Sequence, residues 1–181
     1  MRAHDDRVVR LTAQDGSVAE VEVPFPPVVG GLVEHALRVR RVGVLLVRLG
    51  GSACGVFDGP ELVSSKVTTR QVHGRSAAGG QSQQRFARRR EGQVRVAHRA
   101  FADTAARVLA PVAATLDAVV VGGERTAVDA VLADRRLAAL RPLVTGRLLD
   151  GPDPRQTVLE ASYDQLRAVW IRVVDPAGQL P

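Results

Sequence analysis

Alternating apolar and polar positions predict β-strands at the start of the chain. Residues 8–25 read VVRLTAQDGSVAEVEVPF, in which two alternating segments flank Asp15-Gly16. Asp-Gly between such segments favours a tight hairpin turn. Pro24 ends the second strand because proline cannot donate a ladder hydrogen bond. The pattern therefore predicts a β-hairpin within residues 1–27.

More strands are predicted before residue 73. VGVLLVRLGG and SACGVFDG, together residues 42–59, form a second hairpin pattern across Gly50-Gly51, and ELVSSKVTTRQV, residues 61–72, extends the sheet. A short helix is predicted between the two hairpins, over residues 31–39.

A long basic helix is predicted over residues 84–112. Apolar residues recur there at steps of three and four, which is typical of one buried helix face ending near Pro111. The apolar stripe comprises Val94, Ala97, Phe101, Ala105, Val108 and Val112. A different face carries Arg85, Arg88, Arg89, Arg95 and Arg99.

Strand and helix patterns alternate after this helix. LDAVVVGG, residues 116–123, reads as a buried central strand, and RTAVDAVLAD, residues 125–134, reads as a helix. The segment between them, Gly122-Gly123-Glu124, is interpreted as a strand-to-helix turn because it lacks the spacing and lysine of a nucleotide loop.

The last third supplies three more elements. LRPLVTGRLL, residues 140–149, predicts a strand, residues 154–167 predict a helix after GPDP, and AVWIRVV, residues 168–174, predicts a final strand. This order predicts a single α/β domain over residues 1–181, with a mixed central sheet flanked by helices and an N-terminal hairpin. Phe101 and Trp170 are expected in its core.

Composition and charge narrow the partners. Hydrophobic residues make up 45% and charged residues 24% of the chain, which is ordinary for a globular protein. The net charge of +6 favours an acidic partner such as nucleic acid. Almost all basic residues are arginine, since Lys66 is the only lysine.

Cys54 is the only cysteine, so the chain has no intrachain disulfide and no cysteine-based zinc site. We expect Cys54 to be a small buried residue. His4, His35 and His98 lack metal-ligand spacing, and we expect neither a metal nor a cofactor. The N-terminus lacks the apolar core of a signal peptide, and no apolar run approaches the roughly 20 residues of a membrane span. The expected location is the cytoplasm, without membrane association.

The candidate chemistry lies in residues 73–90, HGRSAAGGQSQQRFARRR. Residues 74–83 offer little to bury and predict a mobile, exposed loop, directly before the arginines. This segment resembles the catalytic segment of eukaryotic and archaeal class 1 translation release factors, in which a Gly-Gly-Gln tip precedes an Arg-Phe-Ala-Arg pattern. Two departures are Ser76-Ala77-Ala78, inserted before the tip, and Gln83-Gln84 in place of an apolar pair.

The chain is too short to add the codon-reading and partner-binding domains of a full termination factor. It is therefore similar to the stand-alone bacterial form of the Vms-like release factor family, peptidyl-tRNA hydrolases of ribosome quality control. The resemblance spans residues 40–135. It implies a release-factor GGQ-domain-like (RNase H-like) layout, and it implies rescue of stalled ribosomes or large subunits without codon recognition.

The resemblance also implies roles for individual residues. Gly79 and Gly80 would let the backbone pass through a narrow channel. A glutamine amide does not titrate near neutral pH, so Gln81 would position a water molecule rather than act as a base. The implied partners are the rRNA of the large subunit and the acceptor end of peptidyl-tRNA, bound by a protein that is monomeric off the ribosome. The implied RNA-binding residues are Lys66, His73, Arg75, Arg85, Arg88, Arg89, Arg90 and Arg95.

Two other functions remain open from the sequence. One is a non-catalytic RNA- or ribosome-binding module that uses the same basic helix. The other is a nuclease on a related α/β scaffold, although the sequence shows no acidic cluster typical of a metal site.

Overall fold

A computed structural model describes residues 7–70 and 81–175, with only the backbone described for residues 81–87. Contacts within the chain define two compact units. The larger comprises Arg40–Tyr163, and the smaller combines Met1–Val39 with Asp164–Pro181. The single-domain assignment over residues 1–181 stays a prediction.

The smaller unit contains a three-stranded antiparallel sheet in the order β1-β2-β8. Its strands are β1 (Val8–Thr12), β2 (Val18–Glu22) and β8 (Trp170–Val174). The predicted N-terminal hairpin is therefore confirmed, as is the short helix, which is α1 (Leu32–Leu37).

Trp170 is not in the core, and its side chain is 70% exposed. The prediction was wrong because β8 pairs with β2 of the small sheet, where Trp170 lies opposite Glu22. Strand side chains alternate between the two faces of a sheet. Trp170 therefore lies on the same face as Arg172, two residues further along β8, and as Glu20, which is opposite Arg172. The apolar side chain of Trp170 suggested burial, but the sequence did not show that Trp170 lies on the more polar face of the small sheet.

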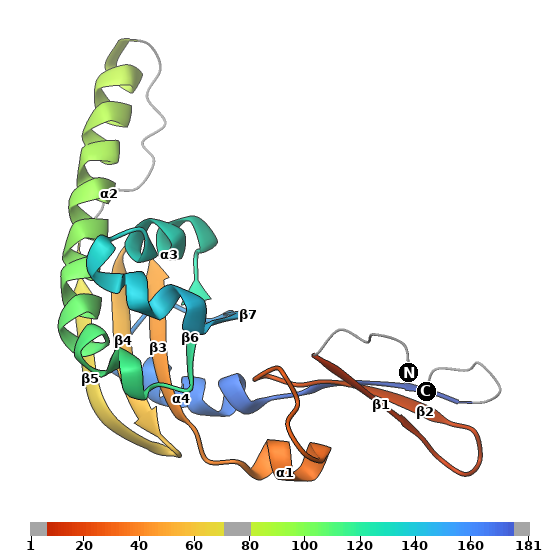
Figure 1. The fold of residues 1–181 in the computed structure, drawn as a ribbon. Helices are drawn as coiled ribbons and strands as arrows, with labels where there is room; N and C mark the ends of the chain where they lie inside the picture. The colour runs from red at the N-terminus through yellow and green to blue at the C-terminus, as the bar shows by residue number, and fades with distance from the viewer. Residues whose placement is uncertain (1–6, 71–80, 176–181) are drawn as a thin grey trace. The chain divides into compact units, whose positions relative to one another are not determined.

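The larger unit is built on a five-stranded mixed sheet in the order β5-β4-β3-β6-β7 (Figure 1). β3 is antiparallel to β4 and parallel to β6, which is parallel to β7, and β5 is antiparallel to β4. The strands are β3 (Arg41–Arg48), β4 (Gly51–Asp58), β5 (Glu61–Thr69), β6 (Ala118–Gly123) and β7 (Val144–Leu149). The predicted mixed α/β sheet is confirmed.

Helices cover both faces of this sheet. One face packs against α2 (Gln81–Val108) and α3 (Arg125–Leu132), and the 3-10 segments η1 (Ala110–Thr115) and η2 (Arg135–Leu143) pack beside these helices. The other face meets the first part of α4 (Gln156–Arg167), where the rings of Phe57 and Tyr163 lie 5.4 Å apart. The fully buried Phe101 of α2 lies in the main core, as predicted.

Gly123 makes the turn from β6 into α3. Its φ of 94° is a conformation that other residues avoid, and a Cβ at this position would collide with the carbonyl oxygen of Val47. The N–H of Glu124 donates to that same oxygen at 2.8 Å, which fixes the start of α3 beside the end of β3. The predicted strand-to-helix turn is confirmed.

Cys54 is buried on β4, as predicted, with 1% of its surface exposed. Burial raises the pKa of its thiol to about 12. We therefore expect thiol reagents at pH 8 to modify the unfolded chain rapidly and the native protein only at its unfolding rate. Thiol absorbance assays with and without denaturant test this expectation, and rapid modification of the native protein would contradict it.

Among the described helices, none is long and apolar enough to cross a membrane.

Candidate nucleic-acid interface

The long helix α2 carries most of the candidate residues that the structure describes. It runs over Gln81–Val108, 28 residues, which corresponds to about 42 Å. It ends at Val108 because Pro111 cannot donate the next helical hydrogen bond. Figure 1 shows that the C-terminal half packs on the sheet and that the N-terminal half extends beyond the strand ends.

The helix begins earlier than predicted. The sequence predicts a loop over residues 74–83 and a helix from Gln84, but Gln81, Ser82 and Gln83 already belong to α2. No glycine or proline interrupts residues 81–91, and glutamine and arginine are good helix formers, so nothing local stops the helix before Gln81. The part of the predicted loop before Gln81, with Arg75, Gly79 and Gly80, lies outside the described residues, as does His73.

The arginines of α2 occupy more than one side of the helix. Arg88, Arg95 and Arg99 are exposed and, at steps of seven and four, share one side. Arg89 is exposed about 100° away, and Arg90 is half-buried on the side that continues the apolar stripe. The side chain of Arg85 is not described. Of the arginines predicted to share a face, Arg88, Arg95 and Arg99 lie on one side, whereas Arg89 lies about 100° around the helix because successive residues turn by that angle.

Lys66 does not join the arginines near the start of α2. It is exposed on β5, two residues from Thr68, whose hydroxyl lies 2.8 Å from that of Thr104 on α2. Thr104 is 23 residues from Gln81 along the helix, so about 35 Å separate this contact from the helix start. Lys66 therefore lies beside the packed half of α2.

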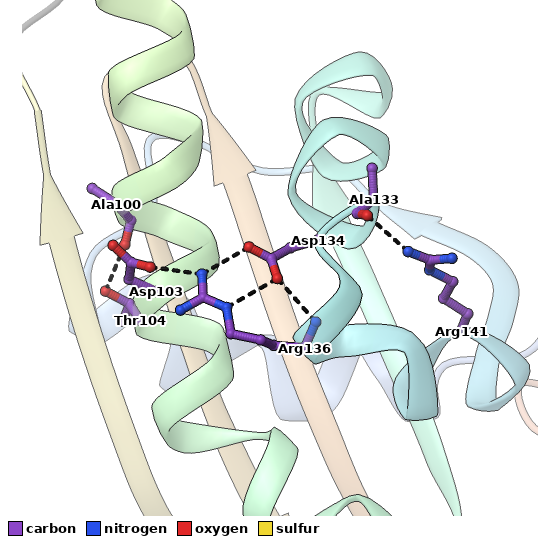
Figure 2. Close-up of polar contacts among 7 residues, drawn as sticks. All are labelled: Ala100, Asp103, Thr104, Ala133, Asp134, Arg136 and Arg141. Carbon is purple, nitrogen blue, oxygen red and sulfur yellow. Dashed lines mark hydrogen bonds and ion pairs between the residues drawn. The ribbon is translucent and has the colours of Figure 1, made fainter.

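Arg136 ties the packed half of α2 to η2 (Figure 2). Its Nη2 donates to Asp103 of α2 at 2.6 Å and to Asp134 at 2.7 Å, and its Nε donates to Asp134 at 3.0 Å. The backbone N–H of Arg136 also donates to Asp134 at 2.9 Å, which caps the start of η2. Both ends of the Asp103–Arg136 pair are nearly half exposed, so the pair fixes geometry more than it adds stability.

These contacts shift the ionisation of the two partners. The hydrogen bonds from the side chain and backbone N–H of Arg136 hold the pKa of Asp134 below its ordinary value of 3.8. Hydrogen bonds to Asp134 and then Asp103 raise the pKa of Arg136. Since the folded-state pKa of Asp134 is depressed, its contribution to stability is present above pH 3.8 and is lost as the pH falls through the folded-state pKa.

We expect NMR titration of the Asp134 carboxyl carbon to give a midpoint below 3.8, and Arg136→Ala to move it back toward 3.8. Arg141→Ala is the matched control, because Arg141 donates to the carbonyl oxygens of Ala133 (Figure 2) and Leu132 and not to Asp134. An Asp134 midpoint that is the same in both variants would show that Arg136 does not cause the shift.

Within residues 7–70 and 81–175, no group of three or more His, Cys, Asp or Glu side chains is arranged to hold a metal ion. The polar contacts on this face hold α2 against its neighbours. The Thr68–Thr104 contact links α2 to β5, and the Asp103–Arg136 contact links α2 to η2.

A family described as acVLRF1, the Actinobacteria/chloroflexi VLRF1 release factor, matches residues 40–172, well over half of the chain. The chain belongs to the VLRF1 release factor family. The matched range contains all of the larger unit and continues past residue 135, where the resemblance visible in the sequence ends. Membership in this family places the protein in translation.

One solved structure agrees on the fold. An archaeal translation termination factor, aRF1, superposes with a TM-score of 0.52 at 17% identity, covering 86% of this chain and 51% of that one. This VLRF1 chain thus spans about half the length of the archaeal factor. A second match, titled only as an archaeal protein, has a TM-score of 0.44 at 16% identity and covers 83% of this chain and 48% of that one. No curated protein matches the chain.

The sequence did not point to the Arg136 contacts. Asp103 and Arg136 are 33 residues apart, and each alone reads as an ordinary surface charge. The only local signal is Asp134 two residues before Arg136, a spacing typical of an Asp side chain that caps the following turn.

Proposed function

We propose that this VLRF1 protein hydrolyses the ester of peptidyl-tRNA on large ribosomal subunits or stalled ribosomes without reading a codon. One observation carries the proposal. Gly79-Gly80-Gln81 ends at the first residue of a helix that extends past its sheet and bears exposed arginines. Such a helix can place Gln81 deep in an RNA cavity while its cations contact phosphates.

The reaction requires one water molecule. Its oxygen forms a bond to the ester carbonyl carbon, the bond from that carbon to the ribose oxygen breaks, and a proton passes to the ribose oxygen. The products are a peptide with a free carboxyl group and a deacylated tRNA. The Gln81 side-chain amide has both a donor and an acceptor, so it can orient the water without changing its own protonation.

The position of Gln81 in α2 supports a second role for its backbone. The first four N–H groups of a helix have no carbonyl four residues earlier within the helix, and the helix dipole is positive at this end. Gln81 is the first residue of α2. Its N–H is therefore suited to donate to the negative oxygen that develops during attack on the ester.

Arg88, Arg89, Arg95 and Arg99 would bind phosphates of rRNA or tRNA and set the depth of Gln81. We assign Arg85, Arg90, Arg75 and His73 the same task, and Lys66 a contact further from the tip. The proposed partners are thus the rRNA of the large subunit and the tRNA acceptor end.

The direct test loads purified large subunits with labelled peptidyl-tRNA and measures released peptide with and without the protein. The proposal expects release that depends on the protein and leaves the tRNA at full length. Tight binding without release would instead favour the non-catalytic RNA-binding module, and release together with a shortened tRNA would favour a nuclease.

A further inference from the structure

An open groove of about 1340 Å³ runs between α2 and the α3–η2 segment of the larger unit. Its α2 wall spans Arg90 to Asp103, about 20 Å of helix. Alanines at positions 102, 127 and 130 line it and leave room where larger side chains would fill it. The groove is therefore long enough for several repeats of a polymer.

Besides Arg136, four arginines line this groove from two distant parts of the sequence. Arg90, Arg95 and Arg99 come from α2, and Arg135 comes from η2. Among the described residues none of the four forms an ion pair with a carboxylate. The fifth lining arginine, Arg136, binds both Asp103 and Asp134 (Figure 2). These two acids, together with Glu91 and Glu124, oppose the five arginines, so the groove lining carries a small net positive charge.

Arg90 adds an independent observation. Its Nε is buried and has no hydrogen-bond partner among the described residues. A buried N–H without an acceptor is destabilising, so a movement of the Arg90 side chain that presents this group to an anionic oxygen in the groove would be favourable. Burial lowers the pKa of His98 in the same groove, with Glu124 opposing the shift, so its ring is neutral near pH 7 and the arginines supply the positive charge.

We propose that this groove binds the phosphodiester backbone of a single RNA strand. Arg95 and Arg99 lie one helical turn, about 6 Å, apart on one side of α2, so they can contact successive phosphates rather than one small anion. Arg90 lines the groove from another side of the helix, about 7.5 Å nearer its start. Arg135 on the opposite wall would hold the strand from its other side. That the polyanion is RNA rests on the proposed function.

The test measures binding of a fluorescein-labelled single-stranded RNA as a function of salt, with all variants made in a Gln81→Ala background so that no ester chemistry is involved. Arg99→Gln combined with Arg135→Gln is expected to reduce the slope of log K against log salt by about 1.4, since each phosphate contact on a single strand contributes roughly 0.7. Circular dichroism and the thermal midpoint confirm that the variant is folded.

The matched control is Arg107→Gln combined with Arg155→Gln, which removes the same charge at two exposed positions outside the groove. We expect the control variant to show the same slope of log K against log salt as the protein with an unsubstituted groove. An unchanged slope in the groove variant, or an equal reduction in the control, would overturn the proposal.

Competition identifies the source of the strand. Displacement of the labelled RNA by deacylated tRNA, but not by large subunits without tRNA, would assign the groove to the tRNA acceptor strand, and the reverse would assign it to rRNA. Both results support a phosphodiester site. Peptide release and the salt dependence of RNA binding test different proposals. If the protein does not release peptide but the groove substitutions reduce the salt slope, the groove proposal stands and the proposed function fails. If the protein releases peptide but the groove substitutions leave the slope unchanged, the groove proposal fails.

Discussion

Gln81→Ala is expected to slow peptide release from large subunits carrying peptidyl-tRNA by roughly 100-fold or more. The substitution removes the amide that orients water, and loss of a single positioning or oxyanion-stabilising group typically costs this much in rate. Binding to the subunits is expected to change less than about 2-fold, because phosphate contacts of the arginines supply most of the affinity. Single-turnover release at saturating protein isolates the chemical step from binding.

The matched control for this substitution is Gln83→Ala. It removes the same amide from the same turn of α2, two residues further along the helix, and should leave the release rate near that of the unsubstituted protein. Equal slowing by both substitutions would indicate a general effect on the start of the helix. Equal release by all three proteins would show that Gln81 is not the catalytic residue.

Arg88→Glu combined with Arg89→Glu should weaken binding to large subunits by roughly tenfold or more at physiological salt. Both side chains are exposed on the half of α2 that extends beyond the sheet, so their reversal should not disturb the core. The slope of log K against log salt should fall by roughly 1.4 to 1.8, since each lost phosphate contact contributes about 0.7 to 0.9. Sedimentation with large subunits over a salt series gives both quantities.

Arg107→Glu combined with Arg155→Glu makes the same change in net charge away from the extended half of α2. If this control weakens binding as much as the Arg88 and Arg89 reversal, the attraction depends on net charge alone and the extended half of α2 is not the contact. Binding that does not depend on salt would contradict phosphate recognition altogether.

Most of the fold could be predicted from periodicity. The steps of three and four that place Ala97, Phe101 and Ala105 on one helix face correspond to fully buried positions, and the apolar run before Gly122 is the buried strand β6. These signals are local, because burial of one face imposes its period on the sequence directly. The helix start at Gln81 was missed because the preceding glycines suggested a longer loop.

What could not be predicted depends on pairing between distant residues. β8 has an ordinary strand pattern, and only its register with β2 places Trp170 on an exposed face. Arg135 reads as a surface charge until η2 brings it to the groove lined by α2. The Gly-Gly-Gln segment, in contrast, could be proposed from the sequence because its residues are adjacent.

The central claim, that this VLRF1 protein cleaves the ester and not the RNA, is tested most directly by mass spectrometry of both products after release in heavy-oxygen water. We expect a peptide with one heavy oxygen in its carboxyl group and a full-length tRNA with an unmodified end. A peptide still attached to a nucleotide, together with a shortened tRNA, would contradict the claim and identify the protein as a nuclease.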